Sequence, residues 1–342
     1  MKKILYYVSD HGKGHATRSI AIIKEILNQN VEIIIRNSSA LDFFKQSLPN
    51  VKIISGKTDE GSSIKNDGFS IDKTETKINQ IKWIQDLEKN SNIEKHIAEK
   101  INPDLIISDI SAIPFLVAKK IKIPSVAISN FSWYDALNFL PSNELAELKS
   151  VYDMADLAIK LPLGTSMNHF KKIKKVGLVS RIPDQSKIQL RKTFEMGKNK
   201  YSVLFALSNS NFTVSCKKTN DVKIFSMNTK IHNSLGSNDY TNLIKGHNLV
   251  SNSDLVICKC GYGIISECLT NGVPFYYVMD PEHLEQEHIS KELENMGLSN
   301  RISLNDINDM ELSSELLEPL PRFHESNDVA VVADFLYQFI KN

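Results

Sequence analysis

The amino-acid sequence predicts an α/β protein with two domains, each built around a parallel sheet. Short apolar runs such as 4–8, 105–108 and 201–207 alternate with segments of helical periodicity. Strands that alternate with helices favour parallel sheets covered on both faces. The chain has 342 residues, more than one typical hydrophobic core accommodates, which predicts two domains of roughly 150 to 180 residues each.

The first half of the chain contains five expected strands. They are residues 4–8, 31–35, 105–108, 125–128 and 157–160. A helix face with the spacing of Ala16, Ile20 and Ile23 follows the first strand, and residues 113–120 form a later helix. The alternation stops around 176–183, so we place the N-terminal domain at residues 1–180.

The second half repeats this layout. Its expected strands are residues 201–207, 222–225, 255–258 and 273–278, within a C-terminal domain at residues 181–325. Apolar residues at helical spacing, Val329, Val332, Phe335, Leu336 and Phe339, predict a final helix within 326–342 that could dock back on the N-terminal domain.

Composition excludes several classes of partner. The chain has 41 basic and 40 acidic residues, so no overall field favours nucleic acid or an anionic membrane. Cys216, Cys258, Cys260 and Cys268 lack a second pair at metal-ligand spacing, and we expect reduced thiols and no metal. The N-terminal apolar run is too short for a signal peptide, and no stretch is long enough to span a bilayer. A cytoplasmic location is therefore expected.

A glycine turn in the second half is typical of a ligand site. Gly261 and Gly263 follow the strand 255–258, and a helix over 264–269 comes next. The glycines let the backbone approach a ligand, and the helix N-terminus offers N–H groups to a phosphate. The turn lacks the third glycine of the dinucleotide fingerprint and the Lys-Ser/Thr of a P-loop. Glu267, in or near the first helical turn, either accepts hydrogen bonds from ribose hydroxyls or complements the helix dipole.

The loop after the first strand contains two histidines, His11 and His15, on either side of a glycine-rich segment. No third metal ligand lies nearby. His15 begins the following helix, where its imidazole could take a proton from a hydroxyl group; otherwise it caps the helix or faces solvent. Asp109 ends the strand 105–108 and either orients His15 or caps the helix after Ser111.

Three motifs together resemble a known family. They are His11-Gly-Lys-Gly-His15-Ala-Thr-Arg18, Asn130-Phe-Ser-Trp133 and Lys259-Cys-Gly261-Tyr-Gly263-Ile-Ile-Ser-Glu267. They resemble GT-B glycosyltransferases, in particular the subgroup whose first loop reads H-G-F-G-H-A-T-R. The chain is similar to the bacterial N-acetylglucosaminyltransferase of peptidoglycan assembly and, more closely, to the N-terminal region of plant arabinokinases. The resemblance covers most of the chain and implies two Rossmann-like domains with parallel sheets that face each other across a cleft.

The resemblance implies a role for each motif. In the C-terminal domain, the glycine turn would meet the diphosphate of a nucleotide sugar, Glu267 the ribose, and Glu285-Gln286 the sugar. The donor-binding residues so implied are Ser208, Asn209, Cys260, Gly261, Tyr262, Gly263, Ile264, Glu267, Glu285 and Gln286. In the N-terminal domain, His15, supported by Asp109, would deprotonate the acceptor. His11, Gly14, Arg18, Asn130 and Trp133 would lie on the acceptor side.

The implied activity is an inverting, metal-independent transfer of a sugar from a nucleoside diphosphate sugar to a hydroxyl acceptor. The co-substrate is expected to be linked to UDP, and no further cofactor is expected. The acceptor is unknown, and a lipid acceptor would bring the chain to a membrane surface. Residues 207–211 replace the usual glycine-rich loop, and Cys260 replaces a small residue or proline. These departures leave two alternatives open, a nucleotide-sugar binding protein without catalysis and, less favoured, a sugar-nucleotide epimerase.

The acceptor side is the less specific half of this interpretation. A polar loop over 59–72 contains glycines at 61 and 68, and the helical segment 77–87 carries Trp83. These residues either clasp an acceptor or form ordinary surface and core, and the second interpretation is the favoured one.

Overall fold

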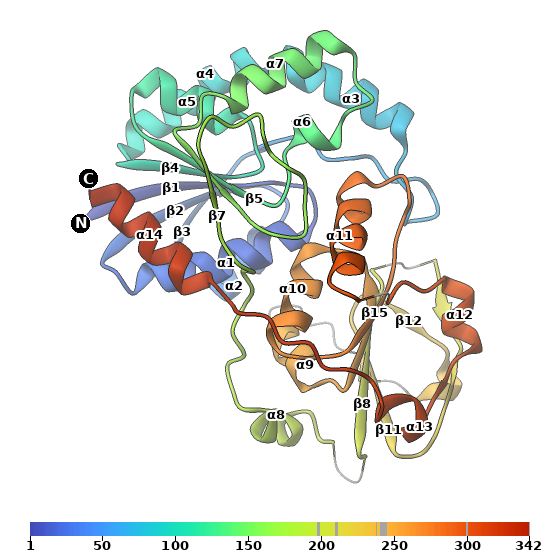
Figure 1. The fold of residues 1–342 in the computed structure, drawn as a ribbon. Helices are drawn as coiled ribbons and strands as arrows, with labels where there is room; N and C mark the ends of the chain where they lie inside the picture. Colours follow the sequence, from blue (N-terminus) through green and yellow to red (C-terminus); the bar gives the residue numbers. More distant parts are fainter. Residues whose placement is uncertain (197–198, 209–210, 237, 240–244, 299, 342) are drawn as a thin grey trace. The chain divides into compact units, whose positions relative to one another are not determined.

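The computed structural model divides the chain into two units, each with its own parallel sheet (Figure 1). The structure describes residues 1–196, 199–208, 211–236, 238–239, 245–298 and 300–341. Unit 1 comprises residues 1–63, 71–179 and 327–342, and unit 2 comprises residues 64–70 and 180–326. The chain passes from unit 1 to unit 2 between Val179 and Ser180. The loop 64–70, which the sequence alone places in the N-terminal domain, groups with unit 2.

Unit 1 contains a seven-stranded sheet in the order β3-β2-β1-β4-β5-β6-β7, with all neighbours parallel. The strands are β1 Lys2–Val8, β2 Val31–Asn37, β3 Lys52–Ser55, β4 Leu105–Asp109, β5 Ser125–Ser129, β6 Leu157–Lys160 and β7 Ile173–Lys175. The five expected strands are present. The edge strands β3 and β7 were not expected, because they are short and only partly buried and so lack a continuous apolar run.

Helices cover both faces of this sheet, as a parallel sheet requires (Figure 1). One face carries α1 Lys13–Leu27, α2 Leu41–Ser47 and α14 Val329–Lys341; the other carries α3 Lys73–Gln85, α4 Leu87–Ile101, α5 Ile113–Ile121 and α7 Ser142–Tyr152. The short helix α6 Trp133–Ala136 follows β5. The C-terminal helix α14 packs against α1, and the Gly177 amide donates to the Asp328 carboxylate (2.6 Å) just before α14.

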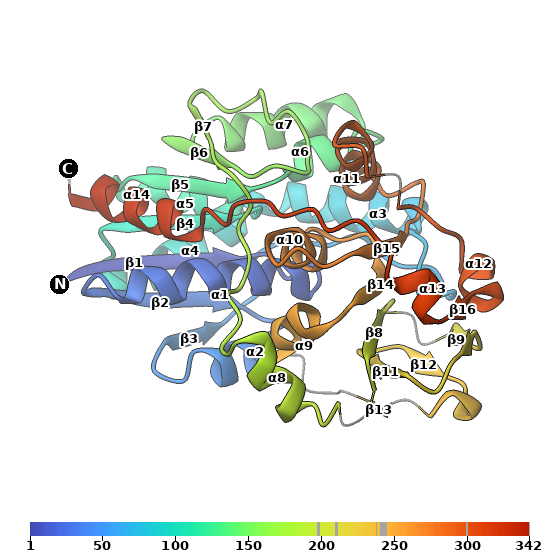
Figure 2. The ribbon, with the colours of Figure 1, turned by 60° about the horizontal axis from the view of Figure 1, so that its bottom comes forward.

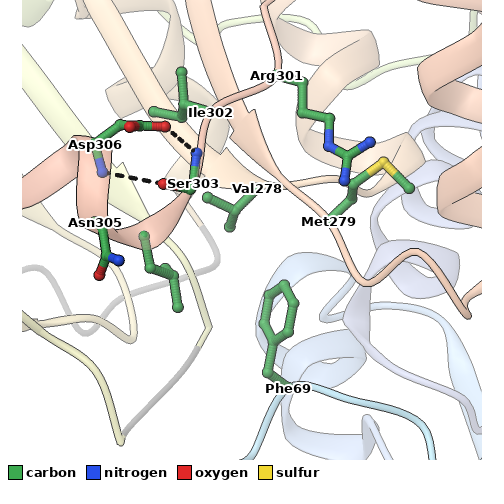
Figure 3. A pocket seen from close by; sticks show the side chains of 9 residues that line it. Phe69, Val278, Met279, Arg301, Ile302, Ser303, Asn305 and Asp306 are labelled. Atoms are coloured by element: carbon green, nitrogen blue, oxygen red, sulfur yellow. Dashed lines mark hydrogen bonds between the residues drawn. The ribbon is translucent and has the colours of Figure 1, made fainter.

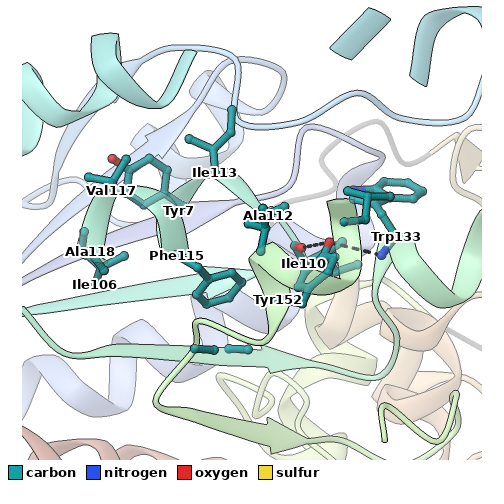
Figure 4. Packing of buried hydrophobic residues seen from close by; sticks show 14 of the residues in the cluster. Tyr7, Ile106, Ile110, Ala112, Ile113, Phe115, Val117, Ala118, Trp133 and Tyr152 are labelled. Carbon is teal, nitrogen blue, oxygen red and sulfur yellow. Dashed lines mark hydrogen bonds between the residues drawn. The ribbon is translucent and has the colours of Figure 1, made fainter. Parts of the chain in front are cut away.

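The core of unit 1 reaches the ends of its central strands. Tyr152 is buried, and its hydroxyl donates to the Ile110 carbonyl (2.6 Å) and accepts from the Trp133 amide (3.2 Å) (Figure 4). One side chain thus ties the loop after β4 to the loop after β5. Both loops carry residues that the sequence indicates as functional.

Unit 2 contains a five-stranded parallel sheet in the order β13-β11-β8-β14-β15 (Figure 2). Its strands are β8 Tyr201–Ala206, β11 Val222–Ser226, β13 Asn238–Asp239, β14 Leu255–Lys259 and β15 Phe275–Val278. Two small sheets pair β9 Thr213–Val214 with β12 Lys230–Ile231 and β10 Lys217–Lys218 with β16 Glu311–Leu312. The helices are α8 Lys187–Thr193, η1 Asn233–Leu235, α9 Gly246–Asn252, α10 Tyr262–Thr270, α11 Leu284–Asn295, α12 Leu304–Asp309 and α13 Ser314–Leu317.

Both sheets contain a topological switch point. In unit 1 the chain moves outward from β1 through β2 to β3 and then returns to the other side of β1 with β4. In unit 2 it moves from β8 through β11 to β13 and returns with β14. Ligands of open α/β sheets bind outside the carboxyl ends of strands at such points. The loops after β1 and β4 in unit 1, and after β8 and β14 in unit 2, are therefore the places to look for a site.

None of the helices among the described residues is both long enough and apolar enough to cross a membrane.

Candidate active site

His15 and Asp109 meet at the switch point of unit 1. Val8 at the end of β1 lies opposite Asp109 at the end of β4, so the loop after β1 passes beside this carboxylate. Gly12 is the N-cap of α1 and has a φ of +75°, a value that favours glycine. This turn places His15 in the first turn of α1, with its Nδ1 3.0 Å from Asp109 Oδ1.

Asp109 is fully buried and accepts several hydrogen bonds. Arg18 donates to both of its carboxylate oxygens, from Nε (2.6 Å) and from Nη2 (2.5 Å), and the Ser19 hydroxyl adds a third donor (3.1 Å). Burial opposes ionisation, but Arg18 and His15 outweigh it and lower the pKa of Asp109 to about 2. Asp109 is therefore an ionised carboxylate that can only accept hydrogen bonds.

The ionised carboxylate fixes the tautomer of His15. Because Asp109 can only accept, His15 Nδ1 carries the proton and Nε2 keeps its lone pair. Arg18 Nη2 also lies 2.8 Å from His15 Nδ1. The guanidinium nitrogen donates instead to the stronger acceptor, Asp109 Oδ1. Nε2 has no hydrogen-bond partner among the described residues. The arrangement suits a general base.

The two alternative interpretations of these residues do not match the structure. His15 is only 5% exposed, so it is not an ordinary solvent-facing histidine. The helix α5 has Ala112 as its N-cap and no side-chain cap hydrogen bond, so Asp109 does not cap it.

Three of the residues expected on the acceptor side are buried within unit 1. Arg18, Asn130 and Trp133 are all buried, with exposures of 2%, 0% and 4%. Arg18 Nη1 donates to Asn130 Oδ1 (2.6 Å), and Asn130 Nδ2 donates to the Leu163 carbonyl (3.0 Å). Asn130 thus holds Arg18 in place, and Trp133 belongs to the hydrophobic core cluster of unit 1. Gly14 remains open, since a Cβ there would meet nothing within 4 Å.

Asp59 is a residue of this region that the sequence did not single out. Its fully buried carboxylate accepts from the Asp10 amide and from Trp133 Nε1, both at 2.9 Å. Burial raises the pKa of Asp59. The polar loop 59–72 is therefore anchored to the His11 loop at its first residue. Trp83, the other candidate for an acceptor clasp, packs against the core of unit 1.

The glycine turn of unit 2 lies at the second switch point. The helix α10 begins at Tyr262 with Gly261 as its N-cap, so Gly263 lies inside the first turn and not before the helix. In the described part of the chain the N-cap makes no side-chain hydrogen bond and no acidic residue lies in the first turn of α10, so the positive end of the helix dipole suits an anion. On the β8 side of the switch point, Ser208 is exposed with a φ of +53°. Asn209 lies outside the described residues.

Glu267 lies beyond the first turn of α10, which corrects the expected position and removes the helix-dipole interpretation. Its side chain is buried, and Arg181 Nε donates to Oε1 (2.7 Å). Burial raises the pKa of Glu267, although Arg181 acts against this rise. Oε2 has no hydrogen-bond partner among the described residues. Arg181 was not predicted as a site residue, because only the tertiary fold brings it to Glu267.

Glu285 and Gln286 differ in their surroundings. Gln286 is 2% exposed, and its Oε1 accepts from the Asp280 amide (2.9 Å). It therefore holds the loop after β15, while the neighbouring Glu285 is half-buried. Cys260 is buried and donates from Sγ to the Gln286 carbonyl (3.6 Å), which links the glycine turn to this loop. Tyr262 is buried as well, and Ile264 is half-buried.

The four cysteines are free, buried thiols. Burial raises the pKa of Cys258 to about 12, so this thiol is not reactive at neutral pH. Among the residues that the structure describes, no three His, Cys, Asp or Glu side chains are grouped in a way that would hold a metal ion.

A cavity of about 470 Å³ opens at the end of β15 in unit 2 (Figure 3). Its lining residues are Phe69, Val278, Met279, Arg301, Ile302, Ser303, Leu304, Asn305 and Asp306. Phe69 comes from the loop 64–70, where Lys259 Nζ donates to its carbonyl (3.2 Å) and lies 4.6 Å from its ring centroid. Phe69, which lies in the polar loop 59–72, thus contacts Lys259, the residue before Cys260.

Two family models match the chain in succession. The model described as glycosyl transferase family 1 matches residues 2–170, and the glycosyltransferase family 28 C-terminal domain matches residues 187–328. The first match falls on unit 1 and the second on unit 2. The chain belongs to the GT-B glycosyltransferases.

Individual proteins are similar to the chain at low sequence identity. The glycosyltransferase is 22% identical over 313 residues to the L-arabinokinase of Arabidopsis thaliana, which corresponds to 84% of this chain but only 29% of that protein. It thus spans less than a third of the arabinokinase. A UDP-glucosyltransferase from Polygonum tinctorium has a TM-score of 0.62 at 10% identity, with 100% of this chain and 99% of that chain covered. MurG of Acinetobacter baumannii has a TM-score of 0.54 at 14% identity, with 99% and 100% covered. At these identities the solved structures show the shared fold alone.

Proposed function

We propose that this glycosyltransferase moves a sugar from a UDP-linked donor to a hydroxyl acceptor, with inversion at the anomeric carbon and without a metal ion. The observation on which this proposal depends is the His15–Asp109 pair. An ionised, buried carboxylate holds the imidazole so that Nε2 is ready to accept a proton. The buried positive charge of Arg18 keeps the carboxylate ionised throughout.

The proposed reaction is a single displacement. The proton of the acceptor hydroxyl passes to His15 Nε2, and the acceptor oxygen forms a bond to the anomeric carbon. At the same time the bond from that carbon to the diphosphate oxygen breaks, and its electron pair leaves with the nucleoside diphosphate. Asp109 stabilises the imidazolium so formed, because it is the nearest ionised acceptor of Nδ1–H.

Unit 2 supplies the donor side of this proposal. The N-terminus of α10, with Gly261 as its N-cap and no acidic residue in its first turn, suits the negative charge that develops on the leaving diphosphate. Glu267 offers Oε2 to the ribose hydroxyls while Arg181 holds Oε1. Support for UDP comes from the relative that is a UDP-glucosyltransferase. No resident cofactor is proposed, and the donor is consumed as a co-substrate.

Turnover by the purified protein tests this proposal. UDP, GDP, dTDP and ADP sugars are offered with a panel of hydroxyl acceptors, and nucleoside diphosphate release is measured with and without EDTA. We expect turnover that EDTA leaves unchanged, and a product of inverted anomeric configuration by NMR. His15→Ala should lower kcat by about 10² to 10⁴-fold, the range of general-base catalysis, while the donor Kd stays within about twofold because His15 lies in unit 1.

Three results would contradict the proposal. They are unchanged turnover in His15→Ala, retention of configuration, and a requirement for a divalent metal. Binding of a nucleoside diphosphate without any transfer or donor hydrolysis would instead identify a non-catalytic nucleotide-sugar binding protein.

A further inference from the structure

The cavity at the carboxyl end of β15 adjoins the glycine turn of unit 2. Val278, one of its lining residues, lies opposite Lys259 in the sheet, and the Val278 carbonyl accepts a hydrogen bond from the Cys260 amide (2.8 Å). The cavity volume of about 470 Å³ lies within the range of small-molecule sites. A group attached to a diphosphate at the N-terminus of α10 could therefore reach this cavity.

An aromatic side of the cavity comes from loop 64–70, which belongs to unit 2 although it lies far from β15 in the sequence. The Lys65 amide donates to the Ser70 carbonyl (2.8 Å), and Asp67 Oδ1 accepts from the Phe69 amide (2.8 Å). Phe69 also packs against the hydrophobic core cluster of unit 2. The loop thus fixes the position of its phenylalanine through its own hydrogen bonds and through the core.

Two further contacts hold loop 64–70 at the switch point of unit 2. Asn211 Nδ2 donates to the Asn66 carbonyl (2.8 Å), and Lys259 Nζ donates to the Phe69 carbonyl (3.2 Å). Asn211 follows β8 and Lys259 ends β14, the neighbouring strands on either side of this switch point. The Lys259 ammonium also lies 4.6 Å from the centroid of the Phe69 ring, whose quadrupole attracts it. The ring is therefore held beside the expected donor site.

Phe69 and Arg301 give the cavity the chemistry of a carbohydrate site. Figure 3 shows their side chains extending toward the cavity from opposite sides. The exposed guanidinium of Arg301 has no hydrogen-bond or ion-pair partner among the described residues, so it can donate to a ligand oxygen. Ser303 and Asp306, by contrast, bond to each other's backbone amides (3.2 and 2.7 Å). The C–H face of a sugar ring suits the negative face of an aromatic ring, and its hydroxyls accept from a guanidinium.

We propose that this cavity receives the sugar of the donor, with Phe69 stacked on a face of the sugar ring and Arg301 donating to an oxygen at its edge. Loop 64–70 then supplies a donor-specificity residue to unit 2 that the family resemblance does not assign. This differs from the expectation from sequence, in which the polar loop 59–72 would clasp the acceptor. The inference deepens the proposed function and rests on it for the position of the diphosphate.

Calorimetry on the full-length protein tests the inference by separating the sugar from the nucleotide. The ligands are UDP and whichever of UDP-glucose, UDP-galactose and UDP-N-acetylglucosamine the wild type binds most tightly. Phe69→Ala should weaken binding of the UDP-sugar about tenfold and leave the Kd for UDP within about twofold, since only the sugar meets the ring. Phe69→Tyr keeps the ring and should bind both ligands like the wild type.

Leu316→Ala is the matched control for Phe69→Ala. Leu316 packs against the same core cluster as Phe69 but does not line the cavity. We expect a comparable loss of stability with both Kd values unchanged. A selective loss of UDP-sugar binding in Leu316→Ala as well would assign the effect to the core and overturn the inference.

Saturation-transfer NMR gives a second readout that does not depend on affinity. Saturation of the protein's aromatic protons should reach the ring protons of the bound sugar, with uracil H5 of the same ligand as the internal reference. The ratio of sugar to uracil signal should be retained in Phe69→Tyr and fall in Phe69→Leu. An unchanged ratio in Phe69→Leu would overturn the inference.

The binding data also distinguish this inference from the proposed function. Equal losses for UDP and the UDP-sugar in Phe69→Ala, or no loss for either, would overturn the inference, while sugar transfer by the wild type would leave the proposed function in place. Binding of the UDP-sugar that depends on Phe69, in a protein that transfers no sugar, would overturn the proposed function and leave the sugar cavity in place. A wild type that binds neither UDP nor any UDP-sugar would overturn both.

Discussion

The switch points of the two units each contain a buried carboxylate paired with an arginine, yet the two carboxylates differ in protonation behaviour. The pKa of Asp109 is lowered to about 2, whereas the pKa of Glu267 is raised. Burial acts in the same direction on both. Asp109 accepts from Arg18, His15 and Ser19, while Glu267 accepts only from Arg181 among the described residues. The number of donors, more than the depth of burial, decides the direction.

This difference suggests that the two carboxylates have different roles, although they lie at equivalent switch points of similar sheets. In unit 1 both oxygens of Asp109 accept hydrogen bonds from protein side chains, His15 among them, so the carboxylate positions a base. In unit 2 Glu267 lies beyond the first turn of α10, and its Oε2 has no hydrogen-bond partner among the described residues, so it can accept hydrogen bonds from a ligand. The groups expected to act at the first switch point are side chains, whereas backbone N–H groups are expected to contribute most at the second.

The largest expected effect comes from Asp109→Asn. The substitution leaves the Arg18 guanidinium buried without its counter-charge, and loss of one partner of a buried ion pair typically costs about 3–5 kcal/mol of unfolding free energy. It also removes the acceptor that fixes the His15 tautomer. Urea denaturation and turnover should both report large losses.

Glu94→Gln is the matched control for this substitution. Glu94 forms a buried ion pair with Arg36 in the same unit, and neither side chain contacts His15. We expect a comparable loss of stability but retained kcat per folded molecule. Equal kcat losses in both variants would mean that Asp109 acts on folding alone.

The pH dependence of the unfolding free energy should show a smaller effect, and its sign should differ between Asp109 and Glu267. Because the pKa of Asp109 is lowered in the folded state, its ionised form contributes about 2 kcal/mol above pH 4, and this is lost as the pH falls toward 2. The pKa of Glu267 is raised, so its contribution is present below its unfolded pKa and is lost as the pH rises through the folded pKa.

These two contributions can be separated by measuring unfolding free energies from pH 2 to pH 7. The proteins compared are wild type, Asp109→Asn and Glu267→Gln. The difference between wild type and Asp109→Asn should shrink on acidification. Glu267→Gln also leaves a buried arginine without its counter-charge, but because the pKa of Glu267 is raised, it should cost less stability at pH 7 than Asp109→Asn does. A large destabilisation by Glu267→Gln at pH 7, equal to that of Asp109→Asn, would remove the contrast between the units.

Much of the fold could be predicted because buried strands leave long apolar runs. The central strands β1, β4, β8 and β14 are of this kind. The edge strands β3 and β7 are short and partly exposed, and their sequences do not differ from loops. The segment expected as one helix over 77–87 is in fact α3 followed by α4, with the break at Asp86. Its polar sequence gives no apolar stripe that would have marked the break.

The site was predictable where it depends on topology and unpredictable where it depends on tertiary contact. Strand ends of a parallel sheet meet at one edge, so the approach of Asp109 to His15 followed from their positions in the sequence. The Arg181–Glu267 pair joins residues 86 positions apart, and Lys259 reaches Phe69 across 190 positions. No local pattern indicates either contact. The same holds for Asp59, because a loop carboxylate gives no sign in the sequence that it is buried.

The most direct test of the division of work between the two units compares His15→Ala with Glu267→Gln. Donor Kd is measured by calorimetry with UDP, and the transfer rate is measured in single turnovers at saturating donor. We expect His15→Ala to lose the rate and keep the Kd. Glu267→Gln should keep the rate within a few-fold and weaken UDP binding by about tenfold or more, as expected for lost hydrogen bonds to a charged group. The same pattern in both variants would contradict a base in unit 1 and a donor site in unit 2.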